Sequence, residues 1–118
     1  MKSDNRKYKR THFVFPVRIG VLRSPKDKKA EDYFHAFSDN ISEGGLKIAL
    51  TKKLESGTPL ELRFDLIMDE KIHMVQTQAE VRWNRTVRKG LYEHGLQFGP
   101  LSDDDWKIVS RFMKDYCL

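Results

Sequence analysis

The sequence predicts a mainly β protein, a small antiparallel six-stranded β-barrel followed by a C-terminal α-helix. Three observations lead to this prediction. Apolar and polar side chains alternate with a period of two over several stretches, and short turn-forming segments separate these stretches. The final stretch instead repeats its apolar residues every three or four positions. At 118 residues, the chain has the length of one domain with a modest core.

The first element is a strand preceded by a polar segment. Residues 1–11 show no periodicity, which predicts a flexible basic leader ahead of a single domain at 12–118. Alternate residues from Phe13 to Val21 are apolar, which indicates a strand. Pro16 lacks an N–H donor, so it favours an edge position or a bulge.

The other strands follow from the same alternation. They are expected at about 33–38, 46–50, 60–66, 75–84 and 92–98. Short polar or glycine-containing segments join them, including a turn at 40–45 and a basic turn at 85–90. Such short connections favour antiparallel neighbours.

The helix is expected at about 102–116. Ser102 is a suitable N-cap, and Asp105 three residues later completes a capping-box arrangement. Aspartates fill the first turn, where the helix dipole favours negative charge. An apolar stripe, expected to cover one mouth of the barrel, consists of Trp106, Val109, Phe112, Met113 and Tyr116.

The net charge of +5 is concentrated in two segments. Residues 1–10 hold five Lys or Arg and one Asp, and residues 23–29 hold four Lys or Arg and one Asp. The rest of the chain is therefore slightly acidic. Local basic patches suit a compact anionic ligand better than a nucleic-acid polymer. Alternatively, the basic terminus is only a solvated segment.

Several classes of protein have little support in the sequence. The single cysteine, Cys117, cannot form an internal disulfide, which fits a reducing, cytoplasmic location. No apolar run approaches the ~20 residues of a spanning helix, so membrane insertion is not expected. The four histidines lack metal-ligand spacing, and there is no catalytic constellation. We therefore expect no metal, no cofactor and no enzyme.

Two short motifs predict a binding site. Arg6 and Arg10 stand four residues apart, and an arginine fork can bind a phosphate or the Hoogsteen edge of guanine. Asn40, Ser42 and Gly45 lie in a turn that can present N–H groups and a hydroxyl to an anion. Together they predict a pocket for a guanine nucleotide with exposed phosphates. Alternatively, Asn and Ser satisfy the backbone of their own turn, and glycine supplies a positive φ.

These motifs also carry a resemblance to a known family. Read as R-x-x-x-R and N-x-S-x-x-G, they resemble the signature of PilZ domains, which are bacterial receptors for the second messenger cyclic di-GMP. The resemblance extends over the chain, in the stretches 37–48, 79–83 and 93–98. It implies the same barrel with a terminal helix.

The resemblance also implies roles for the motif residues in binding cyclic di-GMP. Arg6 and Arg10 would wrap the ligand, contacting phosphate and guanine. Asn40 would accept hydrogen bonds from guanine N–H groups, without the charge-assisted strength of a carboxylate. Ser42 would hydrogen-bond the ligand, and Gly45 would let the backbone come close.

Three further residues extend this candidate site. Lys9 would add to the local positive field, and Gly44 is first a turn glycine and second a ligand contact. Trp83 shares its predicted strand face with Val81, which indicates a place in the core. Its position near the end of the strand, beside Arg82, leaves open a stacking role against guanine.

We therefore expect a non-enzymatic cyclic di-GMP receptor whose leader becomes ordered when the ligand binds. By resemblance, it would signal in trans to an unidentified protein effector in motility, exopolysaccharide and biofilm, or type IV pilus control. The alternative is a PilZ-like structural adaptor that acts through protein contacts without a nucleotide. The chain would be a monomer or a ligand-dependent dimer. A single-strand nucleic-acid binder would need surface aromatics along a basic groove, whereas most aromatics here alternate into the predicted core.

Overall fold

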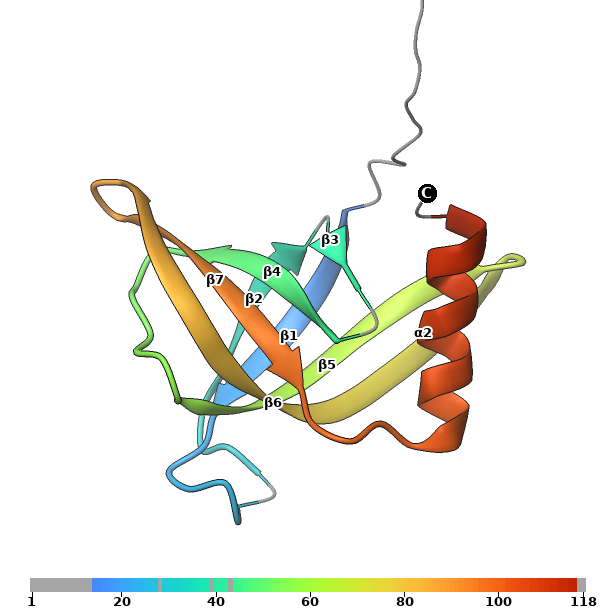
Figure 1. Cartoon of the computed structure of the whole chain (residues 1–118), viewed down its shortest axis with the longest axis horizontal. Coiled ribbons are helices and arrows are strands. Elements are labelled where there is room, and N and C mark those ends of the chain that lie inside the picture. The colour runs from blue at the N-terminus through green and yellow to red at the C-terminus, as the bar shows by residue number, and fades with distance from the viewer. Residues whose placement is uncertain (1–13, 28, 39, 43, 117–118) are drawn as a thin grey trace, which may run out of the picture.

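A computed structural model of the chain describes residues 14–27, 29–38, 40–42 and 44–116. It contains one antiparallel sheet and one helix, α2 (Asp103–Tyr116), as Figure 1 shows. The strands are β1 (Phe15–Val21), β2 (Tyr33–Ser38), β3 (Asn40–Ile41), β4 (Gly45–Leu50), β5 (Pro59–Met68), β6 (Lys71–Arg88) and β7 (Leu91–Phe98).

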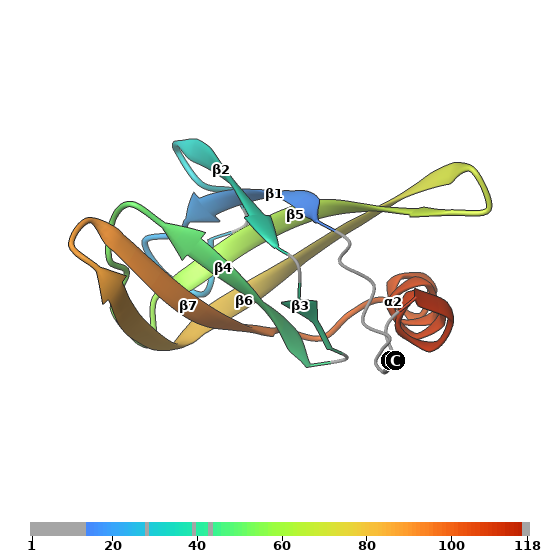
Figure 2. The same ribbon diagram turned by 90° about the horizontal axis from the view of Figure 1, so that it is seen from above.

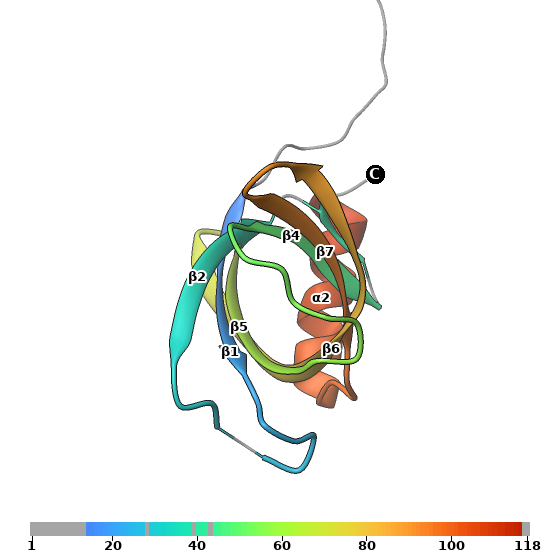
Figure 3. The same cartoon turned by 90° about the vertical axis from the view of Figure 1, so that its left-hand side faces the viewer.

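The sheet is curled into a partial barrel, with the strand order β2-β1-β5-β6-β7-β4-β3 (Figure 3). Its two ends, β2 and β3, are consecutive in the chain. The segment 33–41 therefore pairs first with β1 and then with β4, which brings the ends of the sheet together. The predicted mainly β antiparallel fold with a C-terminal helix is confirmed. The strand count is seven rather than six, because the predicted turn at 40–45 begins with the two-residue strand β3.

Apolar side chains from every strand fill the inside of the curl. Phe64 lies at the centre, with ring centroids 5.7 Å from Phe15 and 5.8 Å from Phe98. From α2, Val109 and Phe112 are buried against this core. Trp106, which was predicted in the apolar stripe of the helix, is instead 44% exposed. Ile108, which was not predicted in the stripe, packs against the core, as Met113 and Tyr116 do. The packed face of α2 therefore includes Ile108 in place of Trp106.

The start of α2 agrees with the prediction. The Ser102 hydroxyl accepts a hydrogen bond from the Asp105 N–H at 3.1 Å, as an N-cap does. The edge position predicted for Pro16 is wrong, because β1 lies between β2 and β5. However, the pairing of β1 with β5 begins only at Val17, so Pro16 removes no donor from that ladder.

The hairpin between β6 and β7 corrects another prediction. The expected basic turn at 85–90 is mostly strand, since β6 continues to Arg88 and the chain reverses at Lys89 and Gly90. Gly90 has a φ of 82°, a conformation that favours glycine. Because residues 85–88 are all exposed, they show no alternation of apolar and polar residues from which the strand could be predicted.

Candidate functional site

The turn after β3 is held together by the Ser42 side chain. Its hydroxyl accepts hydrogen bonds from the N–H groups of Gly44 and Gly45, both at 3.2 Å, and donates to the Gly45 carbonyl at 3.3 Å. The backbone adds a 2.7 Å bond from the Ser42 N–H to the same carbonyl. One donor and two acceptor positions are all that a hydroxyl has. Ser42 therefore has a structural role in the turn.

The two glycines of the turn differ in what surrounds them. A Cβ on Gly45 would lie 1.8 Å from the Leu96 carbonyl oxygen on β7, whereas a Cβ on Gly44 would meet only the Ser42 hydroxyl, at 4.0 Å. Neither glycine has a positive φ, so this part of the alternative interpretation of the turn is wrong. Gly45 is required by the close approach of β4 to β7.

Asn40 presents its side chain outward from β3. Its backbone is held by the buried Ser38 hydroxyl, which accepts from the Asn40 N–H at 3.3 Å and donates to the Asn40 carbonyl at 3.1 Å. The Asn40 side chain is exposed and makes no hydrogen bond to another described residue. The backbone of Asn40 is thus held in place, and its side-chain amide is available to a ligand.

Trp83 lies outside the core, contrary to its predicted strand face. In β6, Val81 pairs with Leu96 while Trp83 pairs with the preceding β7 residue, Gly95, so Arg82 is an extra residue in a β-bulge. The bulge reverses the alternation, and Trp83 is 43% exposed. Its indole packs on Gly95, where a Cβ would lie 2.1 Å from the indole nitrogen.

These residues form one row across four neighbouring strands. Asn40 pairs with Lys47, Lys47 pairs with Gly95, and Gly95 pairs with Trp83. The row and the turn line an open groove of about 410 Å³. At ~4.8 Å per strand, Asn40 and Trp83 are about 14 Å apart.

The cations beside the groove already have carboxylate partners. Lys47 lies 3.5 Å from Glu93, which Arg85 also contacts, and Arg82 lies 3.9 Å from Glu80. The hydrogen bond from Arg85 lowers the pKa of Glu93, so this carboxyl stays charged at neutral pH. These three cations and two carboxylates, in and beside the described part of the groove, leave only one net positive charge.

The structure brings together five of the predicted site residues, which line the groove: Asn40, Ser42, Gly44, Gly45 and Trp83. The predicted positions Arg6, Lys9 and Arg10 lie outside the described residues. Lys47 and Arg82 were not predicted to line it. Lys47 could have been found by counting outward positions from Asn40, but the place of Arg82 depends on the bulge.

His94 lies beneath this surface and is fully buried. Its Nε2 accepts a hydrogen bond from the Leu54 N–H at 2.9 Å, whereas its buried Nδ1 has no hydrogen-bond partner among the described residues. Burial lowers the pKa of His94, so the ring is neutral at pH 7. The described residues contain no cluster of three or more His, Cys, Asp or Glu suited to a metal ion. Within the same residues, no helix is long and apolar enough to cross a membrane.

Comparisons with known proteins agree with this architecture. The PilZ domain family matches residues 4–115. The structure of the inhibitor of motility of Bacillus subtilis (MotI/DgrA) is similar over 91% of this chain, with a TM-score of 0.68 and 25% identity. This chain covers 48% of that protein. The PilZ domain of CeSA from a cellulose-synthesizing bacterium shares the fold, with a TM-score of 0.56 and 15% identity over 89% of this chain and 94% of that one. No curated protein matches the sequence. With a match over nearly its whole length, the chain belongs to the PilZ domain family.

Proposed function

We propose that this domain is a non-enzymatic receptor for cyclic di-GMP and that the groove beside β3 and β4 is its binding site. The observation that carries the proposal is the row from Asn40 to Trp83, which places an available amide and an exposed indole on one outer face. An indole offers a stacking surface for a purine, and an amide oxygen can accept hydrogen bonds from guanine N–H groups.

The length of the row favours a ligand with two bases. Asn40 and Trp83 are separated by three strand spacings, about 14 Å, which is longer than one purine. A mononucleotide would therefore reach one of them, whereas a cyclic dinucleotide can place one guanine on Trp83 and the other near Asn40.

The charges of the groove indicate why the leader would be needed. The Gly44 and Gly45 N–H groups already bond to Ser42, and the nearby cations are paired with carboxylates. A ligand with two phosphates needs further cations. Arg6 and Arg10 are the residues we assign to this role, since a guanidinium binds a phosphate bidentately. Binding would draw residues 6–10 over the groove and create a new surface for a protein effector.

The output of the domain is proposed to be exerted on such an effector. The similar protein from Bacillus subtilis is named as an inhibitor of motility, so motility control is the first process to examine. The competing proposal is an adaptor that uses the same fold without a nucleotide.

Isothermal titration calorimetry separates these two proposals. Cyclic di-GMP should bind, and cyclic di-AMP and GMP should bind at least about tenfold more weakly, a difference of about 1.4 kcal/mol. Asn40→Ala should weaken binding, whereas Arg23→Ala, which removes a positive charge at an exposed arginine in the other basic segment, should not. An equal affinity for cyclic di-AMP would refute guanine recognition, and no binding of either nucleotide would favour the adaptor.

A further inference from the structure

The outer face of β2, β1, β5 and β6 carries an unusual number of exposed hydrophobic side chains. Nine large hydrophobic side chains are exposed in the described part of the chain, and five of them belong to this face. We call these five the apolar patch: Val14, Phe37, Ile67, Ile72 and Met74. Their exposures run from 46% for Met74 to 70% for Ile72. Large contiguous patches of this kind mark interaction surfaces.

The strand register brings the members of the patch together, with Asp65 among them. Ile67 and Ile72 are direct cross-strand partners in β5 and β6, and Met74 follows two residues after Ile72 on the same face. On the other side, Phe37 pairs with Pro16, and β1 is the neighbour of β5. The patch stays exposed although α2 packs nearby, at the end of the barrel beside the β5–β6 hairpin (Figures 1 and 2). There, Phe112 and Tyr116 of α2 line a cavity together with Ile67 and Ile72.

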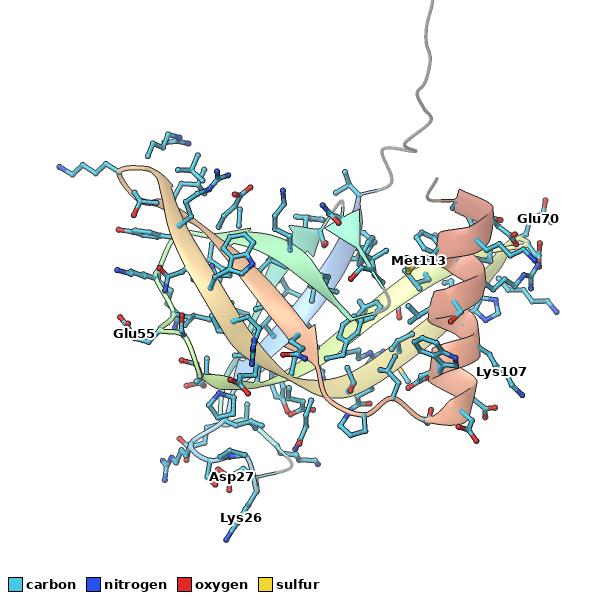
Figure 4. All side chains as sticks on the ribbon, viewed as in Figure 1. Lys26, Asp27, Glu55, Glu70, Lys107 and Met113 are labelled. Carbon is cyan, nitrogen blue, oxygen red and sulfur yellow. The ribbon has the colours of Figure 1, made fainter. Side chains whose placement is uncertain are left out.

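Charges of opposite sign lie at the two ends of the patch. At one end, Arg18 and Arg63 are cross-strand partners, and neither forms an ion pair with a described residue. The Arg18 guanidinium instead stacks on the Tyr33 ring, 4.3 Å from its centroid. At the other end is Glu70, also without an ion pair among the described residues. Asp65 lies within the patch, as the cross-strand partner of Met74. Figure 4 shows Glu70 at the tip of the β5–β6 hairpin.

This arrangement is complementary to itself, and we propose that the face pairs with the same face of a second copy of this chain. The two copies would be related by a two-fold axis that is parallel to the sheet and perpendicular to the strands. Such an axis places β5 of one copy over β5 of the other, with the two strands running in opposite directions. It therefore lays the two apolar patches together and places Arg63 of each copy near Glu70 of the other. Such an isologous contact is the commonest form of protein dimer, and sheets pack face to face in this way at about 10 Å.

The size of the face sets the strength of the dimer. Four strands about 4.8 Å apart and eight residues of ~3.4 Å each give about 500 Å² per copy. A stable interface buries about 800 Å² per partner, so this dimer is weak and depends on protein concentration. Phe37 shares a cavity with Lys47 of the groove, but the centre of the contact, at Ile67 and Ile72, lies outside the groove. The dimer therefore does not require the proposed nucleotide.

Sedimentation velocity of the full chain without nucleotide tests the apolar contact. The protein concentration is raised from about 10 μM to about 1 mM, a range suited to an interface of this size. The average molecular mass should rise from that of the 13.9 kDa monomer toward that of the dimer. Ile72→Glu should weaken the association at least about tenfold, because it places a charge in the centre of the contact. Val87→Glu is the matched control, since Val87 is 48% exposed but lies outside the patch, and it should leave the association unchanged.

The charge contact is tested by a swap. Arg63→Glu and Glu70→Arg should each weaken the dimer, and the double variant should restore it, because both cross-copy pairs are rebuilt with reversed sign. Circular dichroism spectra should match in all variants, since the changed side chains are exposed. A chain that stays monomeric at the highest concentration would overturn the proposal and assign the patch to a different protein. The proposal would also be overturned if the double variant did not restore the dimer, or if Val87→Glu weakened the association as much as Ile72→Glu does.

Discussion

Replacing each of the two turn glycines by alanine should give opposite results, although they are neighbours. In Gly45→Ala the new Cβ would lie 1.8 Å from the Leu96 oxygen, whereas ordinary contacts begin at 3.4 Å. The strands must therefore separate by ~1.6 Å, the difference of those two distances. That movement would break the 2.8 Å bond from the Phe98 N–H to the Gly44 carbonyl and loosen the ladder bonds beside it. Two or three such bonds, at about 1 kcal/mol each, and the disturbed packing of Leu46 cost about 3 kcal/mol.

Gly44→Ala is the matched control. Its Cβ would meet only the Ser42 hydroxyl at 4.0 Å, and its φ is not in the left-handed region. Stability should change by less than about 0.5 kcal/mol. Thermal unfolding followed by circular dichroism should show a loss of about 10 °C for Gly45→Ala and almost none for Gly44→Ala. Equal unfolding temperatures for Gly45→Ala and the parent would refute the close approach of β4 to β7.

Four further predictions follow from the site. Arg10→Ala should weaken cyclic di-GMP binding by about 2 kcal/mol, roughly 30-fold by calorimetry, because a charge-assisted contact is lost; unchanged affinity would remove this residue from the site. With Trp106→Phe leaving Trp83 as the single tryptophan, ligand should alter its fluorescence, and an unaltered signal at saturation would argue against stacking. Ser42→Ala should lower the unfolding free energy by about 1–2 kcal/mol, measured in urea, because two turn N–H groups lose their acceptor; an unchanged midpoint would show that the turn holds without the hydroxyl. His94 is buried and neutral, so the unfolded chain binds the extra proton below its ordinary pKa of about 6.5. Stability should therefore fall as the pH drops from about 6.5 toward the lowered pKa of the folded state, and His94→Gln should show less of this loss in urea titrations at pH 7.5 and 5.

The sequence predicted the fold well where one face of each strand is buried. Strands β1, β2, β4, β5 and β7 follow the alternation of apolar residues, because their inward positions are all needed to fill the core. The end of β6 was missed because residues 85–88 have no buried face, so nothing in their pattern distinguishes a strand from a turn. On α2, the spacing placed Trp106 in the stripe, but Ile108 packs against the core and Trp106 stays exposed.

The candidate site could be predicted only in part. The residues of the turn could be recognised from their local sequence, whereas the position of Trp83 depends on the pairing register of β6. The motif residues Asn40, Ser42 and Gly45 lie together because they are close in sequence. Trp83 joins them through an inserted residue in β6 that a period of two cannot reveal. For Gly45 the residue type was recognised, but the reason for it was not, since the neighbour that excludes a side chain is Leu96 on a strand far along the chain.

The β-bulge at Arg82 has a second effect that links the groove to the core. By reversing the alternation, it turns Trp83 outward onto Gly95 and turns Asn84 inward, opposite His94. The Asn84 side chain then donates to the Leu54 carbonyl at 3.0 Å, while His94 accepts from the Leu54 N–H at 2.9 Å. A regular β6 would bury the indole, leave the groove without its aromatic wall and leave the Leu54 carbonyl without this donor. One extra residue therefore determines both the exposed indole and the bonds from Asn84 and His94 to the β4–β5 connection, so a change that removes the bulge would alter the groove and the core together.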